Sequence, residues 1–433
     1  MSQSSNHKSF IFSPIFGGII LFLCAISALV WANLGHESYH EFWHRPVIEF
    51  HGISGTDYKI SFHQVINEFL MAIFFFFTGL EIKREILYGE LSSSDKAILP
   101  MGAALGGMIF PALIYFVINL GQETAHGWGV PMATDIAFSL AILSLLGNRV
   151  PIALKVFLTA LAIGDDLGAI IVIAAFYTPS IEFIDLLIAL IGLGILFGMN
   201  RFGVRNKLWY YGIGIVIVWM AFLSSGVHST IAGVLVAFTI PSRQGIKHDD
   251  YVDQAKGILD DIKNHPKKDE DIMSETIIFK LKNLSILTKN ATNMSQIEEK
   301  TLHPLVGFMI LPLFAIANAG VAIQGDIGTI MSSPVSIGII CGLMLGKPLG
   351  IFLFTKLFTL LGIGKLPEDI NWRQIIGIGF LGGMGFTMSL FVTDLAFVRA
   401  EYIENAKLAI IVASFTSGII GYLFLNSSLS KKS

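Results

Sequence analysis

The apolar residues of this chain are gathered into long runs that are separated by short polar segments. A helix that spans a membrane needs about 20 mostly apolar residues, and twelve segments approach that requirement. They are residues 12–33, 63–80, 97–119, 132–147, 151–176, 183–199, 209–223, 229–240, 305–323, 335–359, 375–397 and 408–425. The pattern predicts an all-α polytopic membrane protein with twelve transmembrane helices.

The composition supports this prediction and excludes several classes of protein. Hydrophobic residues make up 53% of the chain and charged residues only 14%, whereas a soluble domain has about 25% charged residues. A chain so poor in charge cannot cover a surface that faces water, so a soluble enzyme, a disordered protein and a nucleic-acid binder are excluded. We expect a lipid bilayer around the protein, no nucleic-acid partner, no cofactor and no enzymatic activity. Cys24 and Cys341 lie inside apolar runs and indicate neither a disulfide nor a metal site.

The positions of Lys and Arg predict the orientation in the membrane. If the N-terminus is cytoplasmic and the spans alternate, the cytoplasmic segments other than 241–304 hold thirteen Lys and Arg and the external segments hold four. Cytoplasmic loops are enriched in these residues, so both termini are expected in the cytoplasm. The predicted order is a tail over 1–11, eight helices within 12–240, a cytoplasmic loop over 241–304, four helices within 305–425 and a tail over 426–433.

Two segments outside the spans are long enough to predict structure of their own. In residues 45–62, runs rich in β-forming residues flank Gly-Ile-Ser-Gly, which predicts a short external β-hairpin, with an irregular loop as the alternative. Residues 241–303 carry 11 acidic and 10 basic residues. We expect that segment to be helical in pieces or disordered.

Ionisable residues inside apolar runs are candidates for function because a charge at the centre of a bilayer costs about 2.5–3.5 kcal/mol. Asp135 follows Thr134 where the segment after Pro131 is interrupted. Such an interruption can expose carbonyl and hydroxyl oxygens in an unwound stretch. The alternative is an aspartate that caps a helix close to the membrane interface.

Asp165 and Asp166 lie in the middle of the run Leu-Ala-Ile-Gly-Asp-Asp-Leu-Gly-Ala. Neighbouring residues on a helix point about 100° apart, so one carboxylate can face a substrate while the other faces a partner helix. Desolvation and mutual repulsion favour the protonated form of adjacent carboxyl groups. The pair therefore suits proton uptake and release, although a structural role is an alternative.

Lys347 and a glycine-rich segment complete the candidate site. A buried ammonium needs a counter-charge, and the intramembrane aspartates are the available partners of Lys347, unless the side chain reaches the interface from a helix end. Residues 381–389, Leu-Gly-Gly-Met-Gly-Phe-Thr-Met-Ser, form a second polar interruption. Two interrupted helices in the two halves of a chain are typical of a transporter site.

Five segments together resemble a known family: Gly79–Glu85, Ala133–Phe138, Asp165–Ala169, Gly346–Gly350 and Gly385–Ser389. They are similar to segments of the NhaA-type sodium/proton antiporters of bacterial inner membranes, and the match extends from about residue 15 to 425. The resemblance implies inverted repeats, two broken helices that cross, a homodimer joined at the external hairpin, and a location in the bacterial inner membrane.

The resemblance also assigns roles to residues. It implies that Asp135 and Asp166 hold the transported Na⁺, with Thr134 beside them, and that Asp165 is the partner of Lys347. The second broken helix would contain Gly383, Gly385 and Thr387. Positions linked to a pH response would be Glu81, Arg84, Glu85, His228, Glu299 and His303. Glu81–Glu85 also fits an ordinary anchor on the cytoplasmic side, and His228 a histidine at the interface. Glu68 stands where the family pattern has Asp, and 241–303 is longer than the pattern.

The implied activity is exchange of intracellular Na⁺ or Li⁺ for external H⁺, dependent on pH and electrogenic. Hard cations favour carboxylate and carbonyl oxygens, and the same carboxylates bind protons, so one site can serve both ions. Two rivals remain at this stage. An intramembrane aspartic protease would have Gly-x-Gly-Asp, but Ala162 replaces the first glycine. A transporter of organic anions would need a roomier site with fewer carboxylates.

Overall fold

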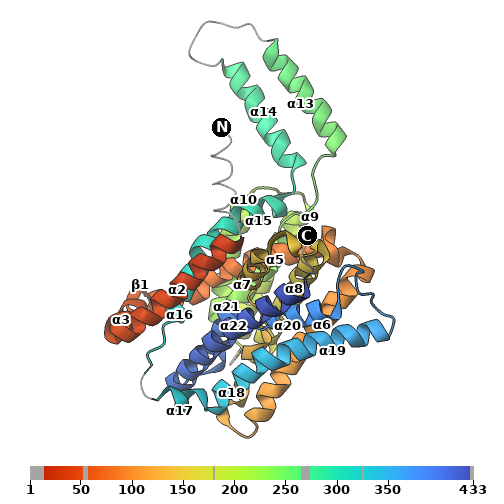
Figure 1. The fold of residues 1–433 in the computed structure, drawn as a ribbon. Helices are drawn as coiled ribbons and strands as arrows, with labels where there is room; N and C mark the ends of the chain where they lie inside the picture. The colour runs from red at the N-terminus through yellow and green to blue at the C-terminus, as the bar shows by residue number, and fades with distance from the viewer. Residues whose placement is uncertain (1–13, 52–56, 179–180, 265–273, 324–325, 430–433) are drawn as a thin grey trace.

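Figure 1 shows the fold of the chain in a computed structural model, which describes residues 14–51, 57–178, 181–264, 274–323 and 326–429. Within these ranges, nine helices are long and apolar enough to cross a membrane. They are α2 (Pro14–Leu34), α4 (Phe62–Gln64) continued by η1 (Val65–Leu70) and α5 (Met71–Tyr88), α6 (Ser94–Ile118), α8 (Ile152–Phe176), α9 (Phe183–Arg201), α10 (Lys207–Ile213) continued by η5 (Gly214–Trp219) and α11 (Met220–Ser225), α15 (Met294–Leu305) continued by η6 (Val306–Ile310) and α16 (Leu311–Asn318), α18 (Pro334–Cys341) continued by η7 (Gly342–Gly346) and α19 (Lys347–Leu360), and α22 (Ala400–Ser428).

Two further segments pass the same test only as bent pairs. The first pair is η3 (Glu123–Met132) with α7 (Ile136–Leu145), bent by 43°, and the second is α20 (Trp372–Gly382) with α21 (Phe386–Ala396), bent by 47°. The shorter apolar helix α12 (Thr230–Thr239) is the remaining segment of this character among the described residues. Together these elements correspond to the twelve predicted segments, so the prediction of a polytopic helical membrane protein is confirmed.

Two boundaries differ from the sequence prediction more than the others do. The first bent pair begins at Glu123 rather than at 132, because its first half contains glycine and polar residues that lower the hydropathy. The ninth helix begins at Met294 rather than at 305, because its first turns carry Glu298, Glu299 and other polar residues. Residues 294–304, which were predicted as the end of a cytoplasmic loop, are therefore part of a helix.

Short elements connect the long ones. The predicted hairpin is confirmed: β1 (Pro46–His51) pairs antiparallel with β2 (Asp57–Ser61) after the helix α3 (His36–His44). The other short helices are η2 (Glu90–Ser92), η4 (Gly147–Arg149) and α17 (Ile327–Met331).

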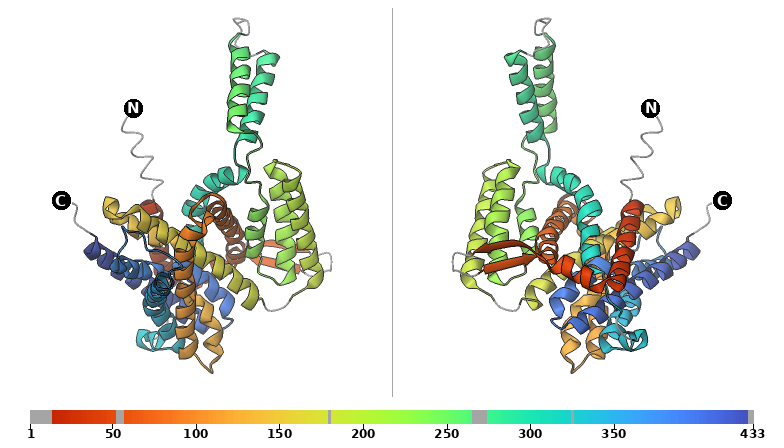
Figure 2. Two further views of the ribbon diagram at one scale, coloured as in Figure 1. Left: turned by 90° about the vertical axis from the view of Figure 1, so that its right-hand side faces the viewer. Right: turned by 90° about the vertical axis from the view of Figure 1, so that its left-hand side faces the viewer.

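The long polar segment forms a helical hairpin. Helices α13 (His248–Lys263) and α14 (Glu275–Ala291) pack side by side and project from the bundle, as Figures 1 and 2 show. Lys280 on α14 forms an ion pair with Asp261 on α13 at 3.1 Å. The described part of this segment is thus helical in pieces, which are α13, α14 and the first turns of α15.

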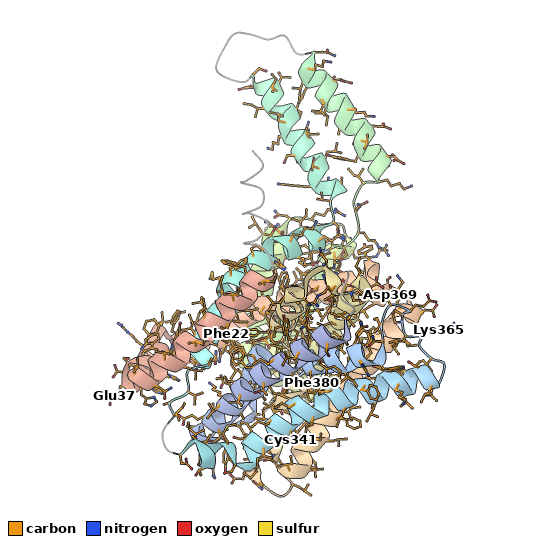
Figure 3. All side chains as sticks on the ribbon, in the orientation of Figure 1. Phe22, Glu37, Cys341, Lys365, Asp369 and Phe380 are labelled. Carbon is orange, nitrogen blue, oxygen red and sulfur yellow. The ribbon has the colours of Figure 1, made fainter. Side chains whose placement is uncertain are left out.

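The side chains on the outside of the bundle suit contact with lipid. Large apolar side chains such as Phe22 (40% exposed) and Leu23 (55% exposed) face outward from α2, and Figure 3 shows Phe22 at the surface. Glu37 lies at one end of the bundle and Lys365 and Asp369 at the opposite end (Figure 3). Apolar sides between two polar ends are the arrangement that a bilayer requires.

The helices form two packed groups, which are seen apart in Figure 2. In the first, which we name the α5 group, α5 packs against α12 and α15, and α9 packs against α11 and α12. In the second, which we name the α22 group, α6 packs against α8 and α19, and α22 packs against α18, α20 and α21. Both bent pairs belong with the α22 group. In the first pair η3 packs against α6 and α21, and in the second pair both α20 and α21 pack against α22.

Candidate functional site

The two helix interruptions meet inside the bundle. The first leaves residues 133–135 outside regular helix and the second leaves 383–385. The backbone N–H of Asp135 donates to the carbonyl of Met384 at 2.6 Å, and the Thr134 hydroxyl lies 2.9 Å from the carbonyl of Gly382. Further bonds across the crossing run from the Ser139 hydroxyl to the carbonyl of Leu381 and from the Ser389 hydroxyl to the carbonyl of Val130, each at 2.8 Å. These bonds satisfy backbone groups that the interruptions leave without helical partners.

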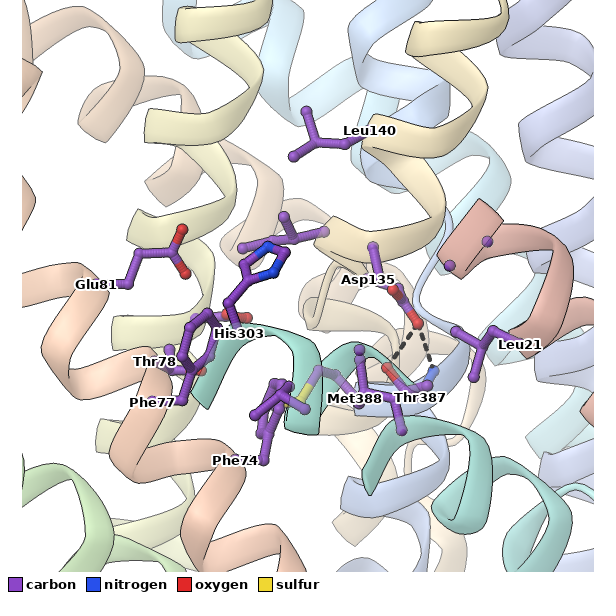
Figure 4. A pocket seen from close by; sticks show the side chains of 18 of the residues that line it. Leu21, Phe74, Phe77, Thr78, Glu81, Asp135, Leu140, His303, Thr387 and Met388 are labelled. Atoms are coloured by element: carbon purple, nitrogen blue, oxygen red, sulfur yellow. Dashed lines mark hydrogen bonds between the residues drawn. The ribbon is translucent and has the colours of Figure 1, made fainter. Parts of the chain in front are cut away.

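Asp135 is held between the N-termini of two half-helices. Its Oδ1 accepts from the backbone N–H of Phe138 at 3.1 Å, in the first turn of α7. Its Oδ2 accepts from the backbone N–H of Thr387 at 3.1 Å and from the Thr387 hydroxyl at 2.6 Å, at the start of α21 (Figure 4). Helix N-termini carry partial positive charge, so the carboxylate of Asp135 balances two of them. The capping role that the sequence left open is therefore present.

Glycine is required where the two interruptions pass each other. A Cβ atom on Gly383 would lie 2.4 Å from the carbonyl oxygen of Leu343, and one on Gly385 would lie 3.0 Å from the carbonyl oxygen of Ala133. Both contacts involve backbone, which cannot move aside as a flexible side chain can. The approach of the second interruption to the first thus depends on Gly385, and its approach to Leu343 in η7 depends on Gly383.

Asp165 and Lys347 form a buried ion pair. The Nζ atom of Lys347 lies 2.5 Å from Oδ2 of Asp165, and both side chains are fully buried. Nζ also donates to the Thr134 hydroxyl at 2.7 Å, and that hydroxyl lies 2.6 Å from the same carboxylate oxygen. Lys347 is the first residue of α19, directly after a widened π-helical turn, so its ammonium remains inside the bundle.

Asp166 faces a cavity instead of the lysine. The cavity has a volume of ≈ 180 Å³ and is lined by Asp166, Asp135, Thr134 and Thr387 among others. Asp166 is 2% exposed, and its Oδ1 has no hydrogen-bond partner among the described residues. A carboxylate oxygen in this position is available to a proton or a cation that enters the cavity.

Four of the six residues linked to a pH response form one cluster. The guanidinium of Arg84 lies 2.5 Å from Glu299, 2.7 Å from Glu85 and 4.0 Å from Glu81. His303 packs its ring against Phe77 and lines the same cavity as Glu81. Figure 4 shows Glu81 and His303 across the cavity from Asp135.

His228 lies apart from this cluster. Its Nε2 is 3.8 Å from Glu68 and its Nδ1 is 2.7 Å from the Thr230 hydroxyl, while the hydroxyl of Ser229 also bonds to Glu68. Burial lowers the pKa of His228, and the nearby Glu68 opposes that effect. The structure therefore does not bring His228 together with Arg84.

Several polar groups that take part in these contacts could not be predicted from the sequence. The carbonyl groups of Gly382 and Met384 and the hydroxyl groups of Ser139 and Ser389 give no signal by residue type, since such groups are common in membrane helices. Asp394 was also missed, although it is ionisable and lies within the predicted span 375–397. It lies near one end of that span, where ionisable residues are less costly than at the centre of a bilayer.

The fold and the site together define a class of protein. Two interrupted helices that cross beside buried carboxylates and a buried lysine are the features of a secondary transporter for cations.

The chain belongs to the Na⁺/H⁺ antiporter 1 family, whose sequence profile matches residues 8–425. It is 52% identical over 428 residues to the Na⁺/H⁺ antiporter NhaA 1 of Psychromonas ingrahamii, covering 98% of each chain. It is 44% identical over 420 residues to the NhaA antiporter of Wolinella succinogenes (96% of this chain, 92% of that one) and 46% identical over 436 residues to that of Helicobacter pylori strain G27 (96% and 94%). The resemblance found in the sequence and the Na⁺/H⁺ exchange it implied are confirmed.

Proposed function

We propose that Na⁺ and H⁺ compete for the carboxylate of Asp166 in the cavity beside the helix crossing. The observation that carries the proposal is that Asp166 is a buried carboxylate that lines the cavity and does not share the lysine partner of Asp165. Na⁺ is a hard cation and favours oxygen ligands, and the cavity also presents the oxygens of Asp135, Thr134 and Thr387. Proton and cation are thus alternative ligands of one group.

Asp135 takes part as the second carboxylate of the site. Its oxygens are bound to Phe138 and Thr387, so in this conformation it contributes charge to the cavity more than free ligand positions. Movement of the half-helices would release those oxygens toward a bound cation. We assign Asp135 both tasks, the balance of the two helix N-termini and cation binding.

The Asp165–Lys347 pair maintains the charge of the site. The ammonium of Lys347 neutralises the charge of one of the three buried aspartates, Asp165. The charges of Asp135 and Asp166 are left to balance a bound cation or protons. Entry of more protons than the number of Na⁺ or Li⁺ ions that leave would make the exchange electrogenic, so the membrane potential would drive it. Intracellular Na⁺ and Li⁺ would leave as external protons enter.

A pH response fits the cluster of Glu81, Arg84, Glu85 and Glu299 with His303 beside it. Protonation of Glu299 would weaken the contact between α5 and α15, because its partner Arg84 lies on α5. Glu81 lines the cavity, so protonation of Glu81 would alter the charge there. His228 would respond independently, through Glu68.

The proposed setting is the bacterial inner membrane, with both termini in the cytoplasm and α13–α14 on the cytoplasmic side. The strands β1 and β2 would then lie outside. A two-stranded sheet has unpaired edges, and pairing of one edge with its copy around a two-fold axis would join a homodimer.

Exchange in membrane vesicles tests the function directly. Vesicles with an imposed pH gradient receive Na⁺, Li⁺ or K⁺ in turn, at pH values from about 6 to about 9. We expect Na⁺ and Li⁺ to collapse the gradient in a pH-dependent manner, and more steeply when a membrane potential is present. A gradient that all three cations leave intact, in vesicles that contain the folded protein, would contradict the proposal.

A further inference from the structure

A network of polar side chains connects the α5 group to the α22 group at one end of the bundle. The carboxylate of Asp394 lies at its centre: Oδ2 accepts from the Asn67 amide at 3.1 Å, and Oδ1 lies 3.1 Å from the ammonium of Lys407. The His63 ring lies 3.8 Å from Asp394 and 3.0 Å from the amide oxygen of Asn318. The amides of Asn67 and Asn318 exchange hydrogen bonds of 3.2 and 2.9 Å.

The members of this network come from both groups of helices. His63 and Asn67 lie in the first turns of the helix that contains α5, and Asn318 is the last residue of α16. Asp394 lies on α21 and Lys407 on α22, in the other group. The bond between Asn67 and Asp394 therefore crosses from one group to the other, whereas the ion pair between Asp394 and Lys407 stays within the α22 group.

Asp394 is mechanically coupled to the cation site. It lies on the same half-helix as Thr387, whose backbone and hydroxyl bind Asp135. If the α22 group moves relative to α5, the helix crossing moves with it. The same movement draws Asp394 away from Asn67.

The network and the part of the cavity lined by Glu81 and His303 lie toward opposite ends of the protein. His63 follows β2 directly, at the end that carries the β-hairpin. Glu81, which lines the cavity, is on the same helix and lies about 27 Å further along, at 1.5 Å per residue. His303, also at the cavity, is on α15, which follows the projecting α14. The cavity thus extends toward the α13–α14 end, and the network lies at the other end.

The bonds suit a contact that opens and closes. Asp394 and His63 are 17% and 20% exposed at their side chains, so water can replace their partners when the groups separate. By contrast, Asp165 and Lys347 are fully buried, and separation would leave charges without water.

We infer that Asp394 and Asn67, supported by His63 and Asn318, form an outer latch that holds the site closed to the outside and must release in each transport cycle. This inference rests on the alternating exposure of the cation site in the proposed exchange. Asp394 is a positioning residue: it does not contact the cation but determines which side of the membrane the site faces.

Reversible cross-linking across the latch tests the inference. In the full chain with Cys24→Ser and Cys341→Ala, the pair Asn67→Cys and Asp394→Cys is bridged by a short bis-methanethiosulfonate reagent. Na⁺/H⁺ exchange is measured in vesicles before bridging, after it, and after reduction of the bridge. We expect bridging to reduce the rate at least tenfold and reduction to restore it.

The matched control is the pair Asp394→Cys and Lys407→Cys, which shares Asp394 but joins two helices of the α22 group. Bridging this pair should leave the exchange rate within about twofold of its unbridged value, because no movement between α21 and α22 is required. Unchanged exchange in the fully bridged Asn67–Asp394 pair would overturn the latch. Loss of exchange in both bridged pairs would overturn it too, since the effect would not depend on crossing between the groups.

A second measurement covers the case in which the paired cysteines prevent exchange before bridging. The single variant Asn67→Cys is labelled from outside with a membrane-impermeant maleimide, with and without Asp394→Ala. Loss of Asp394 should increase the labelling rate several-fold, and equal rates would overturn the latch. The proposed exchange itself is judged separately, on the chain with Asp394 and Asn67 intact, so the two hypotheses fail in different experiments.

Discussion

Asp165 and Asp166 are consecutive in the chain but have different surroundings. The helical rotation of about 100° between neighbours places Asp165 against Lys347 and Asp166 at the cavity. The first carboxylate is neutralised by a permanent partner, and the second is available to exchange ligands. The difference in task follows from the helix geometry and from the position of Lys347.

Replacement of Asp166 by Asn is expected to abolish exchange. An amide retains the shape of the side chain but cannot take up a proton or balance a cation. A unit charge about 4 Å from a cation contributes about 4 kcal/mol at an effective dielectric constant of about 20, so the apparent Na⁺ affinity should fall about a thousandfold. Exchange in vesicles is the measurement, and Asp260→Asn on the exposed face of α13 is the control. Exchange of wild-type rate and affinity in Asp166→Asn would refute the site.

The ion pair between Lys347 and Asp165 leads to a prediction about the stability of the protein. Lys347→Ala leaves Asp165 buried without its partner, which should cost about 3–5 kcal/mol and lower the melting temperature in detergent. The double variant Lys347→Ala with Asp165→Asn removes both charges and should recover part of that loss. A double-mutant cycle measures the coupling, and strictly additive losses would argue against a direct interaction.

At the scale of elements, the interruptions of the two crossing helices position Asp135 more than the regular helical parts do. Each break exposes helix N-termini toward the centre of the bundle, and Asp135 is bound to both of them. The close passage of the two interruptions depends on Gly385, and Gly383 lets the second interruption pack against η7. The bent pairs therefore form one unit, and movement of either should be transmitted to the other.

Gly383→Ala is expected to disrupt this unit. The added methyl group would lie 2.4 Å from the carbonyl oxygen of Leu343 and 2.5 Å from the hydroxyl of Ser417, and such overpacking costs about 1–3 kcal/mol. The melting temperature and the exchange rate should both fall. Gly194→Ala on α9 is the matched control, because nothing lies within 4 Å of its added Cβ. Similar behaviour of the two variants would show that the crossing tolerates a side chain.

At the scale of the whole molecule, the proposed cation site lies within one chain, while the β-hairpin is available for association. Among the described residues, β1 and β2 form the single sheet, and its edges are not covered by further strands. A dimer joined there would stabilise the protein without contributing groups to the cavity.

Deletion of residues 47–60 should therefore yield monomers in mild detergent that still exchange Na⁺ for H⁺. Cross-linking and light scattering measure the oligomeric state, and vesicle exchange measures activity. The control replaces 251–286 by a short Gly-Ser linker. Since α13 and α14 pack side by side, such a linker can join the ends, and this variant should remain dimeric. A hairpin deletion that stays dimeric would place the main contact elsewhere.

Much of the membrane architecture is determined by the sequence itself. Long apolar runs and the cost of burying charge are local properties, so the spans and the buried Asp135, Asp165, Asp166 and Lys347 could be identified without a structure. The pairing of β1 with β2 also follows from a local turn. The same local criterion failed where polar residues lie on a spanning helix, at Glu123 and between 294 and 304, because hydropathy cannot recognise a polar face that the rest of the bundle covers.

The tertiary structure alone decided which polar groups meet. It placed Asp165 rather than Asp166 beside Lys347, which the residues alone left open and only the family resemblance implied. It joined Arg84 to Glu299 across 215 positions of the chain and left His228 with Glu68. It also brought Asp394 to Asn67, 327 positions earlier, although nothing near either residue in the sequence indicates a partner. The physical reason is that a charged or hydrogen-bonding group interacts with what lies within a few ångströms in space, and the packing of distant helices determines those neighbours.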